Sequence, residues 1–267
     1  MWSDDSSTAK AFRARRERQH LRRAVEAAGL HTPVHWDEVT ESTNTTALEF
    51  AAKGEPEWTL VVAEHQTGGR GRLGRTWISE PGSSLLFSIV LRPQLDPDRG
   101  LLLTLLAGLA MAEACRAGTG TDVRCKWPND LLLGDRKVGG ILTEARVRDG
   151  RFQHVVVGIG LNLRSVPRGV EGAAALGDVD RMALLTEFLR RFRERYPPVG
   201  DDGFAHLVVT AYAPVSATLG RRVQATVGEG KVVEGTALDV DPAGNLVLQT
   251  DEGRVTVDSG EVIHVRS

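Results

Sequence analysis

From Val34 onward, hydrophobic and polar positions follow a mixed pattern of strands and helices. The segments "VHWDEVT", "WTLVVAEHQ" and "SSLLFSIVLRP" have the length and the β-branched content of strands. Between the first two, "STNTTALEFAAKG" opens on Ser, Thr and Asn and ends at a glycine, which predicts a helix. The segment "DPDRGLLLTLLAGLAMAEACRAG" is apolar on almost every side, which is typical of a buried helix.

Three further strands are expected in close order. They are "DVRCKW", then "DLLLGDRKVGGILTEARV" folded at Gly134-Asp135, then "FQHVVVGIGLNL" after an Asp149-Gly150 turn. Two helices, "RMALLTEFLRRFRERY" and "DDGFAHLVVTAYA", close the main domain. From residue 219 the pattern changes to short alternating strands separated by turns with Gly and Asp, which predicts a small β-barrel of the SH3-like kind.

The N-terminal segment has a different character. A polar tail, Met1 to Thr8, precedes the helix candidate "KAFRARRERQHLRRAVEAAGL", whose apolar positions Phe12, Leu21 and Val25 are sparse. This pattern favours a solvated helical face, and contact with a polyanion is the alternative.

Composition limits the classes of function. The chain has 267 residues, a formal net charge of -2 and a pI of about 6.4, which argues against coating nucleic acid or an anionic membrane. Its two cysteines suit neither a disulfide framework nor a metal knuckle. Residues 1 to 30 lack the apolar core of a signal peptide, and the apolar run Leu101 to Cys115 is short and contains Glu113. We therefore expect a cytoplasmic protein with no membrane span.

The stretch "GGRGRLGR" nearly matches two phosphate-binding fingerprints, G-x-G-x-x-G and the Walker A loop, in which Lys would replace Arg75. Both fingerprints require the loop to open a helix. Here Pro81-Gly82 and then a strand follow, so neither fingerprint applies. A flexible loop remains whose Arg70, Arg72 and Arg75 suit carboxylate and phosphate oxygens, and Trp77 could stack on a ring. A solvated basic loop beside a core tryptophan is the alternative.

A second cluster, "KWPNDLLLGDRKVGG", holds Lys126, Asn129, Asp130 and Lys137 around one hairpin. If Gly134-Asp135 is the turn, Leu132 faces Lys137 and Asp130 faces Gly139, so that Asp130 and Lys137 are diagonal neighbours on one face. Gly139-Gly140 would let a ligand approach the backbone. The alternative is an ordinary cross-strand ion pair with a bulge.

Two more clusters carry polar or bare surface. In "GIGLN", Gly158, Gly160 and Asn162 share one strand face, where a flat heterocycle could lie or a neighbouring element could pack closely. The segment "ESTNTT" offers Ser42, Thr43 and Asn44 at a helix start. One of them is expected to cap the helix and the others to bind a polar ligand together with Gln66.

Taken together, "STN", "QTGGRGRLGRTW", "KWPND" followed by "DRKVGGIL", and "GIGLN" closely resemble the biotin protein ligases, the biotin-[acetyl-CoA-carboxylase] ligase family. The resemblance runs from about Val34 through the small barrel. It implies an α/β (α+β) fold with a mixed sheet flanked by helices, related to lipoate ligases. The expected parts are a polar tail and helix (1-32), a catalytic biotin- and ATP-binding core (33-217) and the SH3-like barrel (218-267).

The resemblance also implies a reaction and its site. Biotin and ATP, with Mg²⁺, would give biotinyl-5'-AMP, from which biotin passes to a lysine of a biotin carboxyl carrier protein. The implied catalytic residues are Lys137, Arg70, Arg72 and Asp130. The implied biotin-binding residues are Ser42, Thr43, Asn44, Gln66, Gly69, Arg70, Arg72, Lys137 and Gly140. The implied ATP-binding residues are Arg72, Arg75, Trp77, Asn129, Lys137 and Asn162, and the metal ligands are unknown.

Two features depart from the family pattern. Members that repress transcription carry an N-terminal winged helix-turn-helix of about 60 residues, which is longer than the segment before this core, so we expect no nucleic-acid partner. Leu73 stands where a basic residue is common. A lipoate-type acyl-protein ligase and, less favoured, a nucleic-acid-binding regulator remain as alternatives, and the chain could be a monomer or a homodimer.

Overall fold

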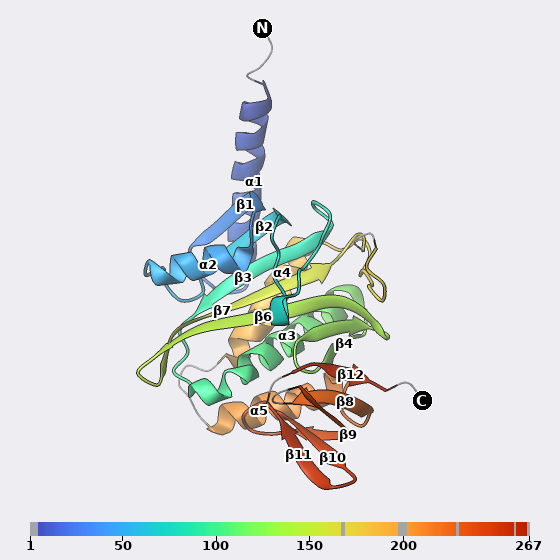
Figure 1. Cartoon of the computed structure of the whole chain (residues 1–267). Coiled ribbons are helices and arrows are strands. Elements are labelled where there is room, and N and C mark those ends of the chain that lie inside the picture. The colour runs from blue at the N-terminus through green and yellow to red at the C-terminus, as the bar shows by residue number, and fades with distance from the viewer. Residues whose placement is uncertain (1–4, 167–168, 197–201, 228–229, 259, 266–267) are drawn as a thin grey trace.

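The computed structural model describes residues 5–166, 169–196, 202–227, 230–258 and 260–265 (Figure 1). The first four residues of the expected polar tail lie outside these ranges. The described residues form a seven-stranded sheet in the order β1-β2-β3-β7-β6-β5-β4 and a five-stranded sheet in the order β11-β10-β9-β8-β12. The strands of the large sheet are β1 (Val34–Thr40), β2 (Leu60–Gln66), β3 (Ser84–Leu91), β4 (Val123–Lys126), β5 (Asp130–Leu133), β6 (Arg136–Arg148) and β7 (Arg151–Asn162).

The large sheet is mixed, because β1 and β2 run parallel while the remaining pairs are antiparallel. The small sheet is antiparallel throughout. Its strands are β8 (Arg222–Val227), β9 (Lys231–Val240), β10 (Leu246–Thr250), β11 (Gly253–Val257) and β12 (Val262–His264). The predicted α/β class with a separate C-terminal β unit is therefore confirmed. The division of the chain at residues 32 and 217 stays a prediction.

Helices cover both faces of the large sheet (Figure 1). They are α1 (Asp5–Ala27), α2 (Thr43–Ala52), α3 (Leu101–Thr119), α4 (Arg181–Arg195) and α5 (Asp202–Tyr212). Since strand side chains alternate, Val61 packs with α2 on one face, whereas Leu60 and Val62 join the core that contains the other helices. By length and composition the segment Pro97–Thr119 could cross a membrane, but 72% of its most apolar window is buried in this fold. It forms the central core helix, as its apolar pattern predicts.

Helix α1 is solvated over only part of its length, which corrects the expectation of a solvated face. Phe12 is 70% exposed, but Leu21 and Val25 are buried in the main core together with Ala24 and Ala28. The alanines add to the apolar stripe of the helix, which is sparse when only the larger apolar residues are counted. In addition, Arg181 of α4 contacts Glu17 of α1 at 2.9 Å and Glu64 of β2. The C-terminal half of α1 is therefore part of the packed body, while its N-terminal half stands out from it (Figure 1).

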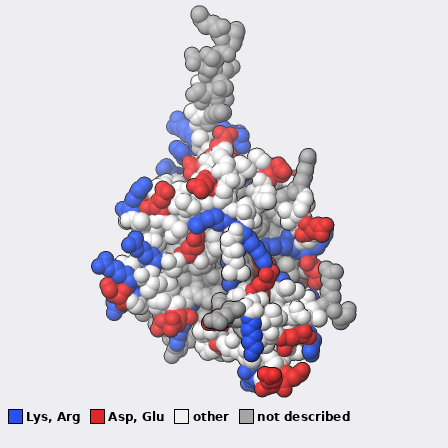
Figure 2. Space-filling model, in the orientation of Figure 1, with Lys and Arg blue, Asp and Glu red and all other residues white. Residues whose placement is uncertain are grey.

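Charged side chains of both signs are interspersed over the face shown in Figure 2. A band of basic side chains crosses the middle of this face, where Figure 1 places the segment between β2 and β3. This distribution agrees with the nearly balanced net charge of the sequence.

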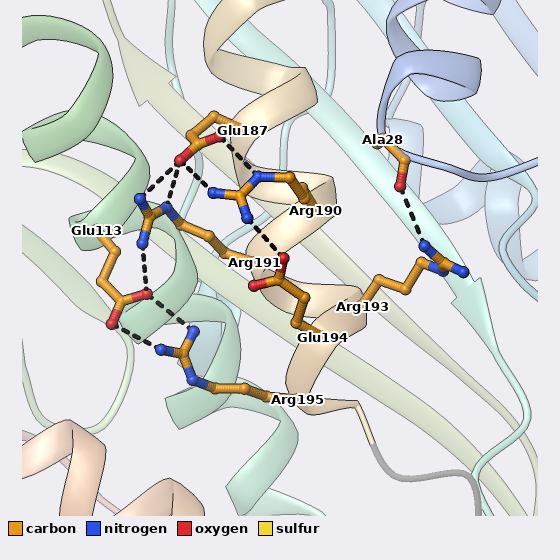
Figure 3. A network of polar contacts seen from close by, with 8 residues as sticks. All are labelled: Ala28, Glu113, Glu187, Arg190, Arg191, Arg193, Glu194 and Arg195. Atoms are coloured by element: carbon orange, nitrogen blue, oxygen red, sulfur yellow. Dashed lines mark hydrogen bonds and ion pairs between the residues drawn. The ribbon is translucent and has the colours of Figure 1, made fainter.

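Arginines of α4 connect α4 to α3 through a network of ion pairs (Figure 3). Glu113 of α3 accepts hydrogen bonds from Arg191 at 3.1 Å and from Arg195 at 2.9 and 3.0 Å. Within α4, Glu187 accepts from Arg190 and Arg191, one turn further along the helix. Each of these arginines therefore has a carboxylate partner that comes from its own helix or from the adjacent one.

The small sheet is fixed to the core through the segment after β4. Trp127 is buried, its indole Nε1 donates to the Gly244 carbonyl at 2.9 Å, and its backbone N–H donates to Thr218 Oγ1 at 3.0 Å. The Ala217 N–H donates to the Cys125 carbonyl at 2.7 Å. Thr218 Oγ1 also lies 3.2 Å from His264 Nε2 of β12, and residues 260–262 line one pocket together with Asp130 and Lys137 of the β5–β6 hairpin.

Candidate active site

The four sequence clusters meet at one hollow of about 150 Å³. Residues from α2, from the glycine-arginine segment and from the β5–β6 hairpin line it together. The predicted site residues on its wall are Ser42, Thr43, Asn44, Gln66, Arg70, Arg72, Arg75, Trp77, Asn129, Asp130, Lys137 and Gly140. Of the described residues in the prediction, Gly69 and Asn162 do not line it.

The glycine-arginine segment folds into a tight hairpin, residues 69–77, which we call the arginine hairpin. The Trp77 N–H donates to the Gly69 carbonyl at 2.8 Å, and the Gly71 N–H donates to the Arg75 carbonyl at 2.7 Å. A single turn of 3-10 helix, Arg72–Gly74, forms the tip, where Gly74 has a φ of 72° that favours glycine. As the sequence indicates, this segment opens no α-helix. Its hydrogen bonds define a hairpin in this state, and the expected flexibility of the loop stays a prediction.

Two arginines of the hairpin are anchored by distant carboxylates, and one is not. Arg70 lies 2.6 Å from Glu144 of β6, and Arg75 lies 2.6 Å from Glu261, which precedes β12. Arg72 donates instead to the neutral amide oxygen of Asn129 at 3.3 Å. Burial lowers the pKa of Arg72, an effect that the nearby Asp130 carboxylate opposes. The hairpin therefore directs one poorly compensated guanidinium into the hollow.

The β5–β6 hairpin turns at Gly134-Asp135 as predicted, and Lys137 Nζ lies 2.6 Å from Asp130 Oδ1. The expected register is wrong by one residue at its open end. A bulge between Leu131 and Leu132 places Asp130 opposite Gly140 and not opposite Gly139, although Leu132 does face Lys137. The alternative of a cross-strand ion pair with a bulge is thus present in the structure, and this pair lies on the wall of the hollow.

The glycine face of β7 is occupied by the protein's own side chains. A Cβ atom on Gly158 would lie 1.7 Å from Asn44 Oδ1, and a Cβ atom on Gly160 would lie 2.6 Å from the Trp77 ring. These contacts show the alternative of close packing, but Gly158 and Gly160 also line the hollow, so the place for a heterocycle stays a prediction. These glycines allow Asn44 and Trp77 to approach the sheet backbone.

The start of α2 is connected to the end of β2. Ser42 occupies the capping position but makes no side-chain capping bond to the described residues, so its hydroxyl faces the hollow uncommitted. The Thr43 N–H and hydroxyl both contact Gln66 Oε1, at 2.7 and 3.0 Å. This contact leaves the Gln66 amide NH₂ as a donor toward the hollow.

Asn162 supports a neighbouring segment. Its Nδ2 donates to the Ala174 carbonyl at 3.1 Å, and its Oδ1 is buried without a partner in the described ranges. The Lys137 N–H donates to the Gly172 carbonyl at 2.7 Å, and the Ala174 N–H donates to the Lys137 carbonyl at 2.8 Å. The backbone around residues 172–174 therefore continues the sheet beside Lys137 beyond the end of β7.

Sequence reasoning omitted three charged residues from the site. Lys126, the first residue of "KWPND", lines the hollow, and burial lowers its pKa. Glu144 and Glu261 bind the hairpin arginines from positions far away in the sequence. Lys126 belongs to the second sequence cluster, but the resemblance gives it no role at the site. No local pattern marks Glu144 or Glu261, because their partners are fixed only by the tertiary fold.

The side chains at the site offer few metal ligands. In the ranges that the structure describes, no group of three or more His, Cys, Asp or Glu side chains could hold a metal ion. Such a site fits Mg²⁺ that is carried largely by phosphate oxygens and water, since Mg²⁺ commonly uses only one or two carboxylates. Asp130, which lines the hollow and pairs with Lys137, could supply such a carboxylate ligand.

The sequence and the fold are similar to those of protein ligases for biotin and lipoate. Residues 36–162 match the profile of the biotin/lipoate A/B protein ligase family, and residues 218–265 match the biotin protein ligase C-terminal domain. The Mycobacterium tuberculosis biotin--[acetyl-CoA-carboxylase] ligase is 33% identical over 245 residues, which is 85% of this chain and 87% of that protein. The chain belongs to the biotin protein ligase family.

Two other proteins are similar to this chain over most of its length. The bifunctional ligase/repressor BirA of Bacillus subtilis is 33% identical over 248 residues, covering 89% of this chain and 75% of that protein. Among solved structures, biotin protein ligase from Aquifex aeolicus in complex with biotin and ATP superimposes with a TM-score of 0.70 at 29% identity. That match covers 89% of this chain and all of the other.

Proposed function

We propose that this chain is an ATP-dependent ligase that activates biotin as biotinyl-5'-AMP and transfers biotin to a lysine of a biotin carboxyl carrier protein. The observation that carries the proposal is the convergence of cationic side chains on one hollow whose wall also offers uncommitted donors. The cations on this wall are Arg70, Arg72, Arg75, Lys126 and Lys137. Of these, Arg72, Arg75, Lys126 and Lys137 fit a reaction in which a carboxylate and a triphosphate must be held together, whereas Arg70 is already paired with Glu144.

The polar end of the hollow suits the ureido head of biotin. Ser42 supplies a hydroxyl that can donate or accept, and Gln66 supplies an amide NH₂, while the Thr43 hydroxyl lies beside them. A ureido group presents one carbonyl acceptor and two N–H donors, so hydroxyls and amides are complementary to it. Asn44 fits a direct role less well, because its amide is already bonded to Ser88, Leu142 and Glu144.

The first step joins two anions. A biotin carboxylate oxygen attacks the α-phosphorus of ATP, the bond to the bridging oxygen breaks, and pyrophosphate leaves. Lys137 and Arg72 provide the positive charge that the expanding phosphorus centre requires, and Asp130 keeps the Lys137 ammonium in place. Bound Mg²⁺ would neutralise the departing pyrophosphate, and Asp130 is the residue that would help to hold it.

In the second step, the amine of the acceptor lysine attacks the carbonyl carbon of biotinyl-5'-AMP. The new amide bond forms, AMP leaves with the electron pair, and the amine loses a proton. The residues proposed for the nucleotide are Arg72, Arg75, Trp77, Asn129, Lys137 and Asn162. The position of Asn162 beneath residues 172–174 supports an indirect contribution, through the backbone that flanks Lys137.

Substrate entry requires the arginine hairpin to move. The hollow measures about 150 Å³, whereas sites for drug-sized ligands span about 300–1,000 Å³. The hairpin contributes Arg70, Arg72, Arg75 and Trp77 to its wall. We infer that the hairpin opens to admit biotin and ATP and then closes over biotinyl-5'-AMP.

The carrier protein is the macromolecular partner in this proposal. The proposal places the protein in the cytoplasm, as a monomer or a homodimer without a nucleic-acid or membrane partner.

Exchange of labelled pyrophosphate into ATP tests the proposal. We expect exchange that requires biotin and is not supported by lipoate, followed by labelling of a purified carrier domain. Exchange that requires lipoate instead would favour the lipoate-type alternative. Absence of exchange together with salt-dependent retardation of duplex DNA would favour the regulator.

A further inference from the structure

Glu144 is a charged residue beside the site that the roles described above leave unexplained. Its carboxylate Oε2 accepts hydrogen bonds from two different elements, from Arg70 of the arginine hairpin at 2.6 Å and from Asn44 of α2 at 2.9 Å. The Glu144 side chain is 27% exposed, so this contact is partly shielded from water. One carboxylate on β6 thus joins the hairpin, the helix and the sheet.

Asn44 holds that carboxylate in a defined position. Its Nδ2 also donates to the Leu142 carbonyl at 3.1 Å, and its Oδ1 lies 2.6 Å from the Ser88 hydroxyl. The absence of a side chain on Gly158 lets this amide lie against β7. With both amide hydrogens and the oxygen bonded, Asn44 has one orientation, and its second N–H points at Glu144.

Arg70 transmits this fixed position to the hairpin. Arg70 and Thr76 form a β-bridge between the two legs of the hairpin, next to the bond from the Trp77 N–H to Gly69. An anchor at Arg70 therefore fixes both legs at once. Arg72, two residues further along, is then presented to Asn129 and the hollow.

We propose that Glu144 is a positioning residue that holds the arginine hairpin across the site through Arg70, and that the Arg70 side chain serves as its anchor and not as a cation that binds substrate. The link to catalysis rests on the proposed function. The anchoring itself is a property of the protein alone. Two competing explanations are an ion pair without consequence, as many exposed pairs are, and an Arg70 that binds substrate directly.

A double-mutant cycle of Glu144→Gln and Arg70→Met separates these explanations, with Glu144→Ala as a second disruption. Glu144→Gln keeps an acceptor for Asn44 but removes the charge that binds Arg70. Glu38→Gln is the matched control, because Glu38 also pairs with an arginine, Arg13 at 3.5 Å, but lies outside the site. The first readout is the rate of trypsin cleavage after Arg72 and Arg75 without ligand.

We expect cleavage about tenfold faster in each Glu144 variant and in Arg70→Met. A loss of about 1.4 kcal/mol in the free energy of hairpin closure raises the population of the open hairpin tenfold. The second readout is exchange kinetics, in which KM for biotin should rise about tenfold while kcat stays within about twofold. In the double variant, the cleavage rate and the KM for biotin should be no higher than in either single variant. Melting temperatures should match that of Glu38→Gln, which distinguishes a loosened hairpin from a loosened fold.

Unchanged cleavage in both Glu144 variants would overturn the proposal, and so would additive effects in the cycle. A loss of kcat in Arg70→Met that Glu144→Gln does not reproduce would show that Arg70 binds substrate directly. If the wild-type protein shows no exchange at all, the proposed function fails. The cleavage readout still decides whether Glu144 anchors the hairpin.

Discussion

The arginines of α4 and those of the arginine hairpin are the same kind of residue in two different situations. On α4, Arg190, Arg191 and Arg195 are matched by carboxylates on their own helix or on α3 (Figure 3). In the hairpin, Arg70 and Arg75 are held by distant carboxylates. Among the described residues, no carboxylate lies in ion-pair contact with Arg72.

This difference separates arginines that stabilise the fold from arginines whose charge remains available to a ligand. A fully matched guanidinium joins two helices and gains little from an added anion. A buried guanidinium bonded only to an amide retains unsatisfied positive charge, and an anionic substrate can satisfy it. The comparison predicts that substitutions on the pocket side change chemistry, whereas substitutions in the α3–α4 network change stability.

The largest effect is expected from Lys137→Ala. Removing the ammonium leaves the biotin carboxylate and the α-phosphate without their shared cation, which should cost on the order of 3 kcal/mol at the transition state. Biotin-dependent pyrophosphate exchange should be nearly lost while the variant still melts cooperatively. Exchange close to the wild-type rate would remove Lys137 from the mechanism.

A smaller effect is expected from Arg72→Gly, which removes the uncompensated charge of the hairpin. The variant should still form biotinyl-5'-AMP but release it about tenfold faster or more, because fewer contacts hold the hairpin closed. Biotin affinity should fall, and bystander lysines should become labelled. Single-turnover formation and release of labelled biotinyl-5'-AMP measures this. If retention equals that of wild type, the hairpin does not act as a lid.

On the other side of the comparison, Glu113→Gln should leave exchange unchanged and lower the free energy of unfolding by about 1.5 kcal/mol, because Arg195 loses its charged partner and Arg191 keeps only Glu187. Chemical denaturation measures the change. Glu194→Gln is the control, since Glu194 is about half exposed and its bond to Arg190 should contribute little. If the two variants lower the free energy of unfolding equally, the ion pairs of Glu113 stabilise the fold no more than an exposed pair does.

The smallest effect concerns His264 of β12. Burial, followed by the charges of Lys126 and Arg221, lowers the pKa of His264 from 6.5 to about 4. Between these pH values the unfolded chain binds a proton that the folded chain does not bind, so stability falls as the pH drops from 6.5 toward 4. We expect this group to change the free energy of unfolding by about 1 kcal/mol after solvent screening, and His264→Gln should abolish the change. Denaturation at pH 7 and pH 5 measures it, and an unchanged slope in the variant would assign the pH dependence to other groups.

The order of elements and much of the site follow from the sequence. Alternation and turn residues predict each strand of the large sheet, and the Gly134-Asp135 turn brings Asp130 and Lys137 together. A bulge was one of two alternatives for this hairpin, but its position at Leu131 does not follow from the sequence, because a one-residue shift in register leaves no mark in the local pattern. Nor did local pattern show that Asn44 and Trp77 fill the spaces at Gly158 and Gly160, since those contacts join residues far apart in the chain.

The position of Glu261 beside Arg75 has a consequence for synthesis of the protein. The strands and helices that carry Ser42, Lys137 and Asn162 can pack while the ribosome is still making the small sheet. Until residues 260–262 emerge and fold, one side of the hollow is missing and the hairpin lacks its second anchor. A nascent core would thus hold the hairpin closed less firmly than the complete protein does.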